Sequence, residues 1–352
     1  MSRLKNWLME HWELFAFVAL ALAPFGISSL NGALGGQVTI LFIYCILALG
    51  LNVMVGYTGL LHLGIAAFFG IGAYAMAILT APVFPFQMGW LAATVLSIAV
   101  AAGIGFALGT PTLQLRGDAL AIVTLGFGEF VVTVLRNLEQ VTGGMKGLNP
   151  VPPPGAGISI MNIDLGTAFM VDPRWFYLLT LSALAGVVWA MKRLENSRLG
   201  RAWVAVREDA TAASSLGIST TQTKLSAFAM SAAVAALAGC LYAATLSTTA
   251  DPNAYNFNRS MMILCAVILG GLGSVLGTLV GVTILVGFDT VILPRIDALL
   301  QQLLNHSPEG VLSFGGWRLA MVGLVLVIVM RFRPEGLIPS RQLAAELHGG
   351  QQ

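Results

Sequence analysis

The feature that most constrains the fold is a run of 102 consecutive residues, 14 to 115, without a single Asp, Glu, Lys or Arg. No core segment of a soluble protein is that long, whereas one membrane-spanning helix needs about 20 apolar residues and the run has room for about four. Only 10% of the 352 residues are charged, against roughly 25% in an ordinary soluble domain. We therefore expect an all-α integral membrane protein.

Hydropathy alone identifies nine apolar segments of spanning length. They lie near residues 14–30, 38–56, 60–81, 89–108, 119–135, 175–191, 225–246, 260–293 and 318–330. The stretch 260–293 is long for one span and contains the glycine-rich turn Gly270 to Ser274. Short, glycine-interrupted apolar segments are where transporters break helices around a binding site.

Basic residues orient these segments, because short loops rich in Lys and Arg stay in the cytoplasm. Six basic residues fall between the sixth and seventh segments, and Arg or Lys also mark both termini. All three regions should therefore be cytoplasmic, but nine passes would put the termini on opposite sides. The conflict disappears if 260–293 is two short spans, which gives about ten transmembrane helices with cytoplasmic N- and C-termini.

Residues 1–352 should form a single transmembrane domain. Because the chain changes sides with each pass, the same count of spans assigns every loop to the cytoplasmic or the extracytoplasmic side of the membrane. Residues 137–174 and about 294–316 become extracytoplasmic, and 192–223 forms a cytoplasmic segment. The run Pro150 to Pro154 allows neither helix nor strand. Contact with an extracytoplasmic partner and a merely connecting role are equally open for both outer loops. The net charge of +2, without a basic stripe, gives no reason to expect nucleic-acid binding.

The chain has no visible energy source or catalytic centre. None of its four lysines stands in the Gly-Lys-Ser/Thr context of a P-loop, so we expect no cofactor in this chain. The energy comes from a partner or from an ion gradient, and gradient-driven carriers usually need several intramembrane acids. Glu129 is the one acid well inside an apolar segment. Four scattered histidines form no metal cluster, so an enzyme is not expected.

The cytoplasmic segment carries a pattern suited to docking. Val206, Ala210, Ala213 and Gly217 recur at i, i+4, i+7 and i+11, which places small residues on one face of a continuous helix. A helix lying on lipid headgroups is the alternative, but it would be expected to present large apolar residues.

The residues of this segment also resemble the EAA coupling loop of ABC importer permeases, which contacts the ATPase. They are Gly200-Arg201-Ala202-Trp203, Arg207-Glu208-Asp209 and Ala212-Ala213-x3-Gly217-Ile218. The resemblance implies coupling roles for Arg207, Glu208, Asp209, Ala212, Ala213 and Gly217. Thr211 stands where the motif has its leading Glu, so the salt-bridging role falls to Glu208 or Asp209.

Further motifs, in one order along nearly the whole chain, narrow this resemblance. They are Asn52 to Gly59, His62 to Tyr74, Thr142 to Gly144, Leu269 to Ser274 and Arg333 to Leu337. Together they resemble the LivM type of branched-chain amino acid ABC permease. This implies import of leucine, isoleucine or valine by alternating access across a bacterial inner membrane. It also implies a LivH-type permease partner, two cytoplasmic ATPases that bind ATP, and an extracytoplasmic binding protein. Urea, other amino acids or amides are alternative substrates, and a gradient-driven carrier is a less favoured alternative.

Three residues are candidates for the substrate pathway: Tyr57, His62 and Glu129. A lone intramembrane carboxylate costs a few kcal/mol, so Glu129 should face the bundle interior or water, where it binds a substrate ammonium group or pairs with Arg136. His62 either lines the pathway or hydrogen-bonds to a neighbouring helix.

The spacing of Gly273, Gly277 and Gly281 forms a GxxxGxxxG ridge. Such a ridge favours close helix packing, with substrate contact as the alternative.

Overall fold

The computed structural model describes residues 33–112, 118–155, 159–160, 163–164, 172–249, 251–292 and 336–338, with a few isolated positions. The spans expected near 14–30 and 318–330, the loop near 294–316 and the motif at 333–337 lie wholly or largely outside these residues. The described residues keep the fold in the all-α class, with one short hairpin outside the helices. Strands β1 (Ser159–Ile160) and β2 (Ile163–Asp164) pair antiparallel in the loop before Pro173, because a loop outside the apolar helices can satisfy its backbone groups in a short hairpin.

Helices make up nearly all of the rest. The bundle consists of α3 (Ala33–Asn52), α4 (Ile65–Thr80), α5 (Trp90–Thr112), α6 (Asp118–Asn137), α9 (Pro173–Glu195), α12 (Thr220–Leu246), α13 (Phe257–Gly270) and α14 (Val275–Gly287). Shorter pieces are α7 (Glu139–Thr142), α10 (Arg198–Glu208), α11 (Ala210–Ser215), the 3-10 turns η3 (Gly144–Lys146) and η4 (Pro252–Tyr255), and the π-helical turns η2 (Val53–Tyr57) and η5 (Phe288–Ile292).

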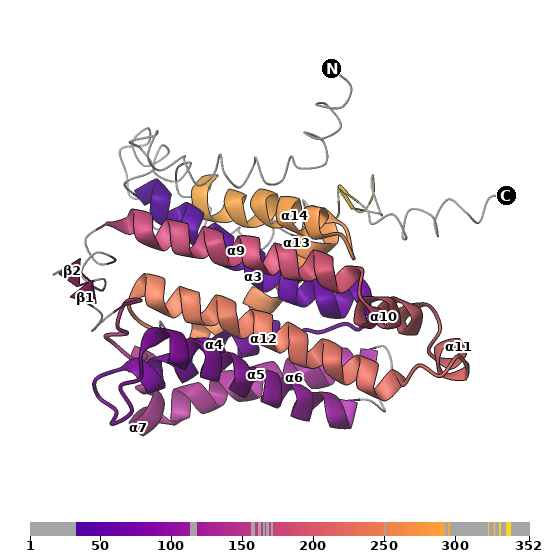
Figure 1. The fold of residues 1–352 in the computed structure, drawn as a ribbon, viewed down its shortest axis with the longest axis horizontal. Coiled ribbons are helices and arrows are strands. Elements are labelled where there is room, and N and C mark those ends of the chain that lie inside the picture. The colour runs from indigo at the N-terminus through magenta and orange to yellow at the C-terminus, as the bar shows by residue number, and fades with distance from the viewer. Residues whose placement is uncertain are drawn as a thin grey trace, which may run out of the picture.

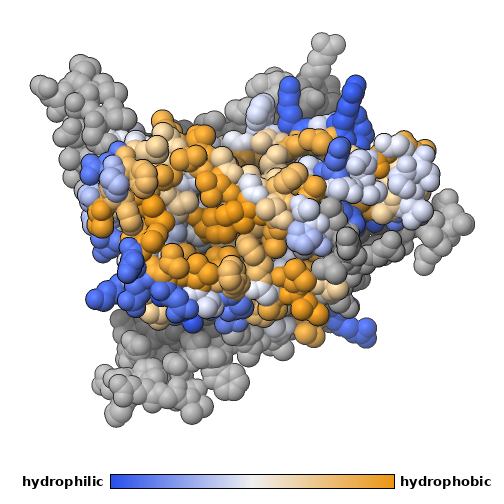
Figure 2. Space-filling view, turned by 90° about the horizontal axis from the view of Figure 1, so that it is seen from below, coloured by the Kyte–Doolittle hydropathy of each residue, from blue (hydrophilic) through white to orange (hydrophobic). Residues whose placement is uncertain are grey.

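Five of these helical segments are long and apolar enough to cross a membrane. They are Gly35–Tyr57, Trp90–Pro111, Ala119–Asn137, Pro173–Glu195 and Thr220–Leu246. Large apolar side chains on α5 and α6 are exposed, among them Leu91, Val95, Ile122 and Phe130. Figure 2 shows an apolar band on this side of the molecule, with hydrophilic groups toward both ends. Such a surface suits contact with lipid tails.

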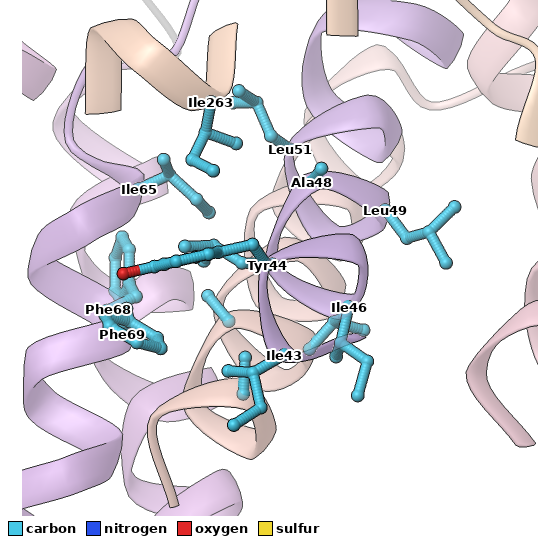
Figure 3. Close-up of a cluster of buried hydrophobic side chains, with 14 of the residues drawn as sticks. Ile43, Tyr44, Ile46, Ala48, Leu49, Leu51, Ile65, Phe68, Phe69 and Ile263 are labelled. Carbon is cyan, nitrogen blue, oxygen red and sulfur yellow. The ribbon is translucent and has the colours of Figure 1, made fainter. Parts of the chain in front are cut away.

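Helix α4 packs mainly against α12, α5 and α6, with a smaller contact to α13. A Cβ added to Gly72 would overlap the backbone of Ala236, and one added to Gly239 would overlap the carbonyl of Phe69. Glycine at both positions therefore lets α4 and α12 approach closely, which is how helices pack where lipid provides no hydrophobic drive. Figure 3 shows Tyr44 of α3 reaching toward Phe68 and Phe69 of α4, in a core that also contains Ile263 of α13.

The glycine-rich stretch divides into two antiparallel helices, α13 and α14, at a turn between Gly270 and Val275. Gly277 and Gly281 of α14 face the backbone of α13 at Gly270 and Ala266. The expected three-glycine ridge needs a correction, because Gly273 lies in the turn with a φ of +75°. The Ser274 side chain caps α14 by accepting the Gly277 N–H at 3.1 Å, so the helix begins only after Gly273.

The polar segments separate to the two ends of the bundle. Figure 1 shows α10 and α11 at one end and α7 with the β1–β2 hairpin at the other. The described parts of 137–174 and the segment 192–223 therefore lie at opposite ends of the bundle.

Candidate functional site

Helix α10 folds back against the ends of two bundle helices. Ser197 caps it by accepting the Gly200 N–H at 3.2 Å. Trp203 is only 1% exposed, and its indole N–H donates to the Thr223 carbonyl at 3.1 Å and to Ser226 Oγ at 3.0 Å, both on α12. On its other side the Trp203 ring stacks on Tyr57, with centroids 6.4 Å apart. Trp203 thus anchors α10 to α12 and to the end of α3.

The expected continuous docking helix is wrong, because the chain breaks at Asp209. This residue has an extended backbone, and its carboxylate accepts the N–H groups of Thr211 at 2.7 Å and Ala212 at 3.1 Å. A new helix, α11, therefore starts at Ala210 in a different direction. Of the four residues expected on one face, Val206 and Ala213 are buried whereas Ala210 and Gly217 are exposed.

Helix α11 presents a projecting surface at this end of the bundle. Glu208, Asp209 and Ala212 are exposed, and Leu216 is 81% exposed. The N–H groups of Ala212 and Thr211 hold the pKa of the Asp209 carboxyl below its usual value, because a hydrogen-bonded carboxylate favours the ionised form. Asp209 is thus a helix cap, which leaves Glu208 as the exposed acid without an observed structural role among the described residues.

Arg207 points toward the bundle instead of outward. Its guanidinium donates to the carbonyl of Gly56 at 2.7 Å. Gly56 lies in the π-helical turn η2, which directly follows α3. The carbonyls at a helix end have no partner within the helix, and a cation there is favourable to the helix dipole. Arg207 therefore joins α10 to the end of α3.

His62 lies in the non-helical stretch before α4 and is 1% exposed. Its ring packs between Phe68 and Phe228, with centroids 5.7 Å from each. Nδ1 is buried, and no partner for it is found within the described part of the chain. The sequence left two roles open for His62, namely lining the pathway and hydrogen-bonding to a neighbouring helix. Within the described residues no such hydrogen bond from Nδ1 is observed.

Glu129 is the twelfth of the 20 residues of α6, and its side chain is exposed on this chain's surface instead of facing the interior of its own bundle. One carboxylate oxygen accepts the N–H of Phe257, the first residue of α13, at 3.2 Å. No ion pair with Arg136 is present in the described residues, because Arg136 lies seven residues further along α6, about 10 Å along the axis.

The three pathway candidates do not form one cluster in this conformation. Tyr57 is buried against Trp203, His62 is enclosed by aromatic rings, and Glu129 lies at the outer seam of α6 and α13. No hydrogen bond or ring contact joins any two of them in the residues that the structure describes. The same residues contain no group of three or more His, Cys, Asp or Glu side chains placed to bind a metal.

Several residues that organise this region were not predicted from the sequence. Thr124 of α6 accepts the Leu63 N–H at 3.1 Å, and Ser260 of α13 accepts the Ala66 N–H at 3.1 Å. Asn52 at the end of α3 accepts the Gly273 N–H at 2.9 Å. The available signal was a polar residue within an apolar helix, which needs a partner when water is absent.

Apolar helices of spanning length, the close glycine-mediated packing of α4 against α12, and the α10–α11 segment at one end of the bundle define a multi-pass membrane protein. The family described as "Branched-chain amino acid transport system / permease component" matches residues 33–330. The chain belongs to this family, and it is a permease component of the ABC-importer type.

Its relatives are consistent with that membership. The chain is 36% identical to the high-affinity branched-chain amino acid transport system permease protein LivM of Salmonella typhimurium, over 96% of this chain and 77% of the relative. LivM of Escherichia coli K12 gives the same figures. LivH of Escherichia coli K12, also a branched-chain amino acid permease protein, is 24% identical over 84% of this chain and 91% of its own length. No solved structure gives a significant match.

Proposed function

We propose that the chain is one of two related permease subunits of an importer for leucine, isoleucine or valine in the bacterial inner membrane. The similarity to both LivM and LivH supports a paired permease. Two cytoplasmic ATPases bind the ATP that powers alternating access, an extracytoplasmic binding protein delivers the substrate, and this chain contributes no cofactor and no catalytic residue. Urea, other amino acids and amides are the alternative substrates within the family.

The observation that carries the proposal is the projecting α10–α11 segment, held by Trp203 and Arg207 and presenting the exposed Leu216. An apolar side chain that is 81% exposed beside Glu208 suits a groove on a protein partner. We assign this end, with residues 192–223, to the cytoplasm, and the end with 137–174 to the outside. About ten spans with both termini cytoplasmic complete the proposed topology.

The seam between α6 and α13 is the proposed face toward the pathway and the second permease. Glu129 lies about 16 Å along α6, near mid-membrane depth. An exposed carboxylate there cannot lie against lipid without a cost of a few kcal/mol. Water or the partner subunit therefore covers this seam, and the carboxylate is placed to attract the ammonium group of an amino acid.

The proposal is tested with Leu216→Asp in the complete transporter. Loss of the ATPases on co-purification, with the second permease retained, is the expected result, because a charge replaces the docking side chain. Leu199→Asp, another exposed leucine at the same end, is the matched control and should keep the ATPases bound. Undiminished ATPase binding by Leu216→Asp would contradict the assigned docking surface. Leucine uptake that survives deletion of every candidate ATPase would instead favour a gradient-driven carrier.

Measuring which amino acids the cognate binding protein retains tests the substrate separately. Retention of urea or an amide in place of a branched-chain amino acid would overturn the substrate assignment without affecting the docking surface.

A further inference from the structure

Three segments that are far apart in the sequence meet at Gly56, in the π-helical turn that ends α3. From one side comes α10, whose Arg207 guanidinium donates to the Gly56 carbonyl at 2.7 Å across 151 residues of sequence. The stem of Arg207 also lies against Gly59, where an added Cβ would be 3.0 Å from its Cγ. The coupling segment is thus fixed to the end of α3 by both a charged hydrogen bond and packing.

From the other side comes the turn between α13 and α14. The Asn52 side chain, 1% exposed, accepts the Gly273 N–H at 2.9 Å across 221 residues of sequence. An added Cβ on Gly56 would overlap Asn52 Oδ1 and lie 2.5 Å from the Gly273 nitrogen. Only glycine at position 56 therefore allows the three segments to approach one another this closely.

Helix α13 extends this junction toward the proposed pathway. It runs from Phe257, whose N–H is bonded to Glu129, to Gly270 beside the junction, a length of about 20 Å. The turn at its far end is held by the close backbone approach of Gly270 to Gly277 of α14, and by the Leu337 N–H, which donates to the Leu269 carbonyl at 3.0 Å. A displacement of the turn therefore moves α13 as a packed rod, and its first residue moves against Glu129.

We infer that Arg207 and Asn52 are positioning residues that transmit movement of the α10–α11 segment, through the π-helical turn of α3, to the α13–α14 hairpin. The inference rests on the proposed function. It changes the role expected for Arg207, which acts inside the permease instead of on the ATPase surface. A π-helical turn is a common local irregularity at functional sites, and here it places the Gly56 carbonyl between the two contacts.

The test uses the complete transporter in liposomes, with leucine uptake and ATP hydrolysis measured on the same sample. Arg207→Met removes the guanidinium and keeps an apolar stem over Gly59, whereas Asn52→Ala removes the acceptor for Gly273. Each should keep the ATPases bound yet lower leucine imported per ATP by about tenfold, the scale of a typical coupling between sites. Arg207→Lys keeps a cationic donor and should recover part of that ratio.

The control is Arg193→Met, which removes an exposed arginine at the same end of the bundle whose observed contact is the Trp189 ring of its own helix, at 5.6 Å. It should leave the ratio unchanged. The double variant Arg207→Met with Asn52→Ala should lose no more than either single variant, because residues of one linkage are not additive.

An unchanged uptake-to-hydrolysis ratio in Arg207→Met, or full additivity in the double variant, would overturn the inference while wild-type transport still supports the proposed function. A wild-type complex that neither retains ATPases nor imports leucine would instead refute the proposed function. If Asn52→Ala fails to insert, the comparison of Arg207→Met with Arg207→Lys decides the result.

Discussion

Replacing Trp203 by alanine should detach α10 from the bundle without unfolding the permease. The indole is 1% exposed, bonds to two groups on α12 and stacks on Tyr57. Every one of these contacts holds α10, whereas α3 keeps its packing against α12, α9 and α14, and α12 keeps its packing against α4 and α5. The damage should therefore stay local to the proposed coupling segment.

The magnitude follows from the contacts that are lost. Truncating a buried tryptophan to alanine costs about 3–5 kcal/mol, which raises the opening equilibrium of α10 by roughly 10²- to 10⁴-fold. Trp203→Phe keeps an aromatic ring beside Tyr57 and loses only the indole donor. That loss is worth about 1–2 kcal/mol, or a factor of about 5–30 in the equilibrium.

Hydrogen–deuterium exchange of the α10 amides measures this opening directly. We expect exchange to rise from wild type to Trp203→Phe to Trp203→Ala, with the amides of α4 unaffected. Trp189→Ala is the matched control, since that side chain is 66% exposed on α9 and should change stability by no more than about 0.5 kcal/mol. Equal protection of α10 in wild type and Trp203→Ala, or loss of protection throughout the bundle, would refute the reasoning.

Three further predictions address the helix crossing, the α11 cap and the seam. Gly239→Ala should cost about 1–3 kcal/mol of stability and lower the thermal unfolding temperature, since its Cβ would meet Phe69 and Ala73 of α4. Gly103→Ala is the control and should leave that temperature unchanged, because nothing lies within 4 Å of an added Cβ there. Equal shifts in the two variants would contradict the close crossing of α4 and α12. The Asp209 cap has a lowered pKa, so its stabilisation is present above the usual pKa of about 3.9 and is lost as pH falls through the lowered folded value. Amide exchange at Thr211 and Ala212 should therefore stay slow from pH 7 to 5 in wild type. At pH 7 it should become fast in Asp209→Ala but stay slow in Asp209→Asn, which keeps a side-chain oxygen as acceptor. Slow exchange in Asp209→Ala would exclude the cap. Glu129→Gln keeps an acceptor for Phe257 N–H but removes the charge, so leucine uptake should fall about tenfold or more at unchanged thermal stability, and normal uptake would rule out ammonium recognition.

The candidate site was only partly predictable from its sequence. One shared helix face was predicted for Val206, Ala210, Ala213 and Gly217. That prediction requires one continuous helix, although Asp209 is a residue type that commonly begins a new one. Because Asp209 caps α11, these four residues do not share the face of one helix. The sequence singles out Glu129 as a costly intramembrane acid, but the direction of its side chain depends on how α6 packs against α13.

What the sequence determined by itself is the membrane class, the family and the division of residues 260–293 at a glycine turn. These follow from hydropathy, charge placement and motif order, which are properties of consecutive residues. Only the tertiary structure decided that Arg207 bonds to Gly56 and that Asn52 bonds to Gly273. Local sequence cannot choose such partners, because a buried donor or acceptor is satisfied by whichever backbone group the packing of distant helices brings within about 3 Å.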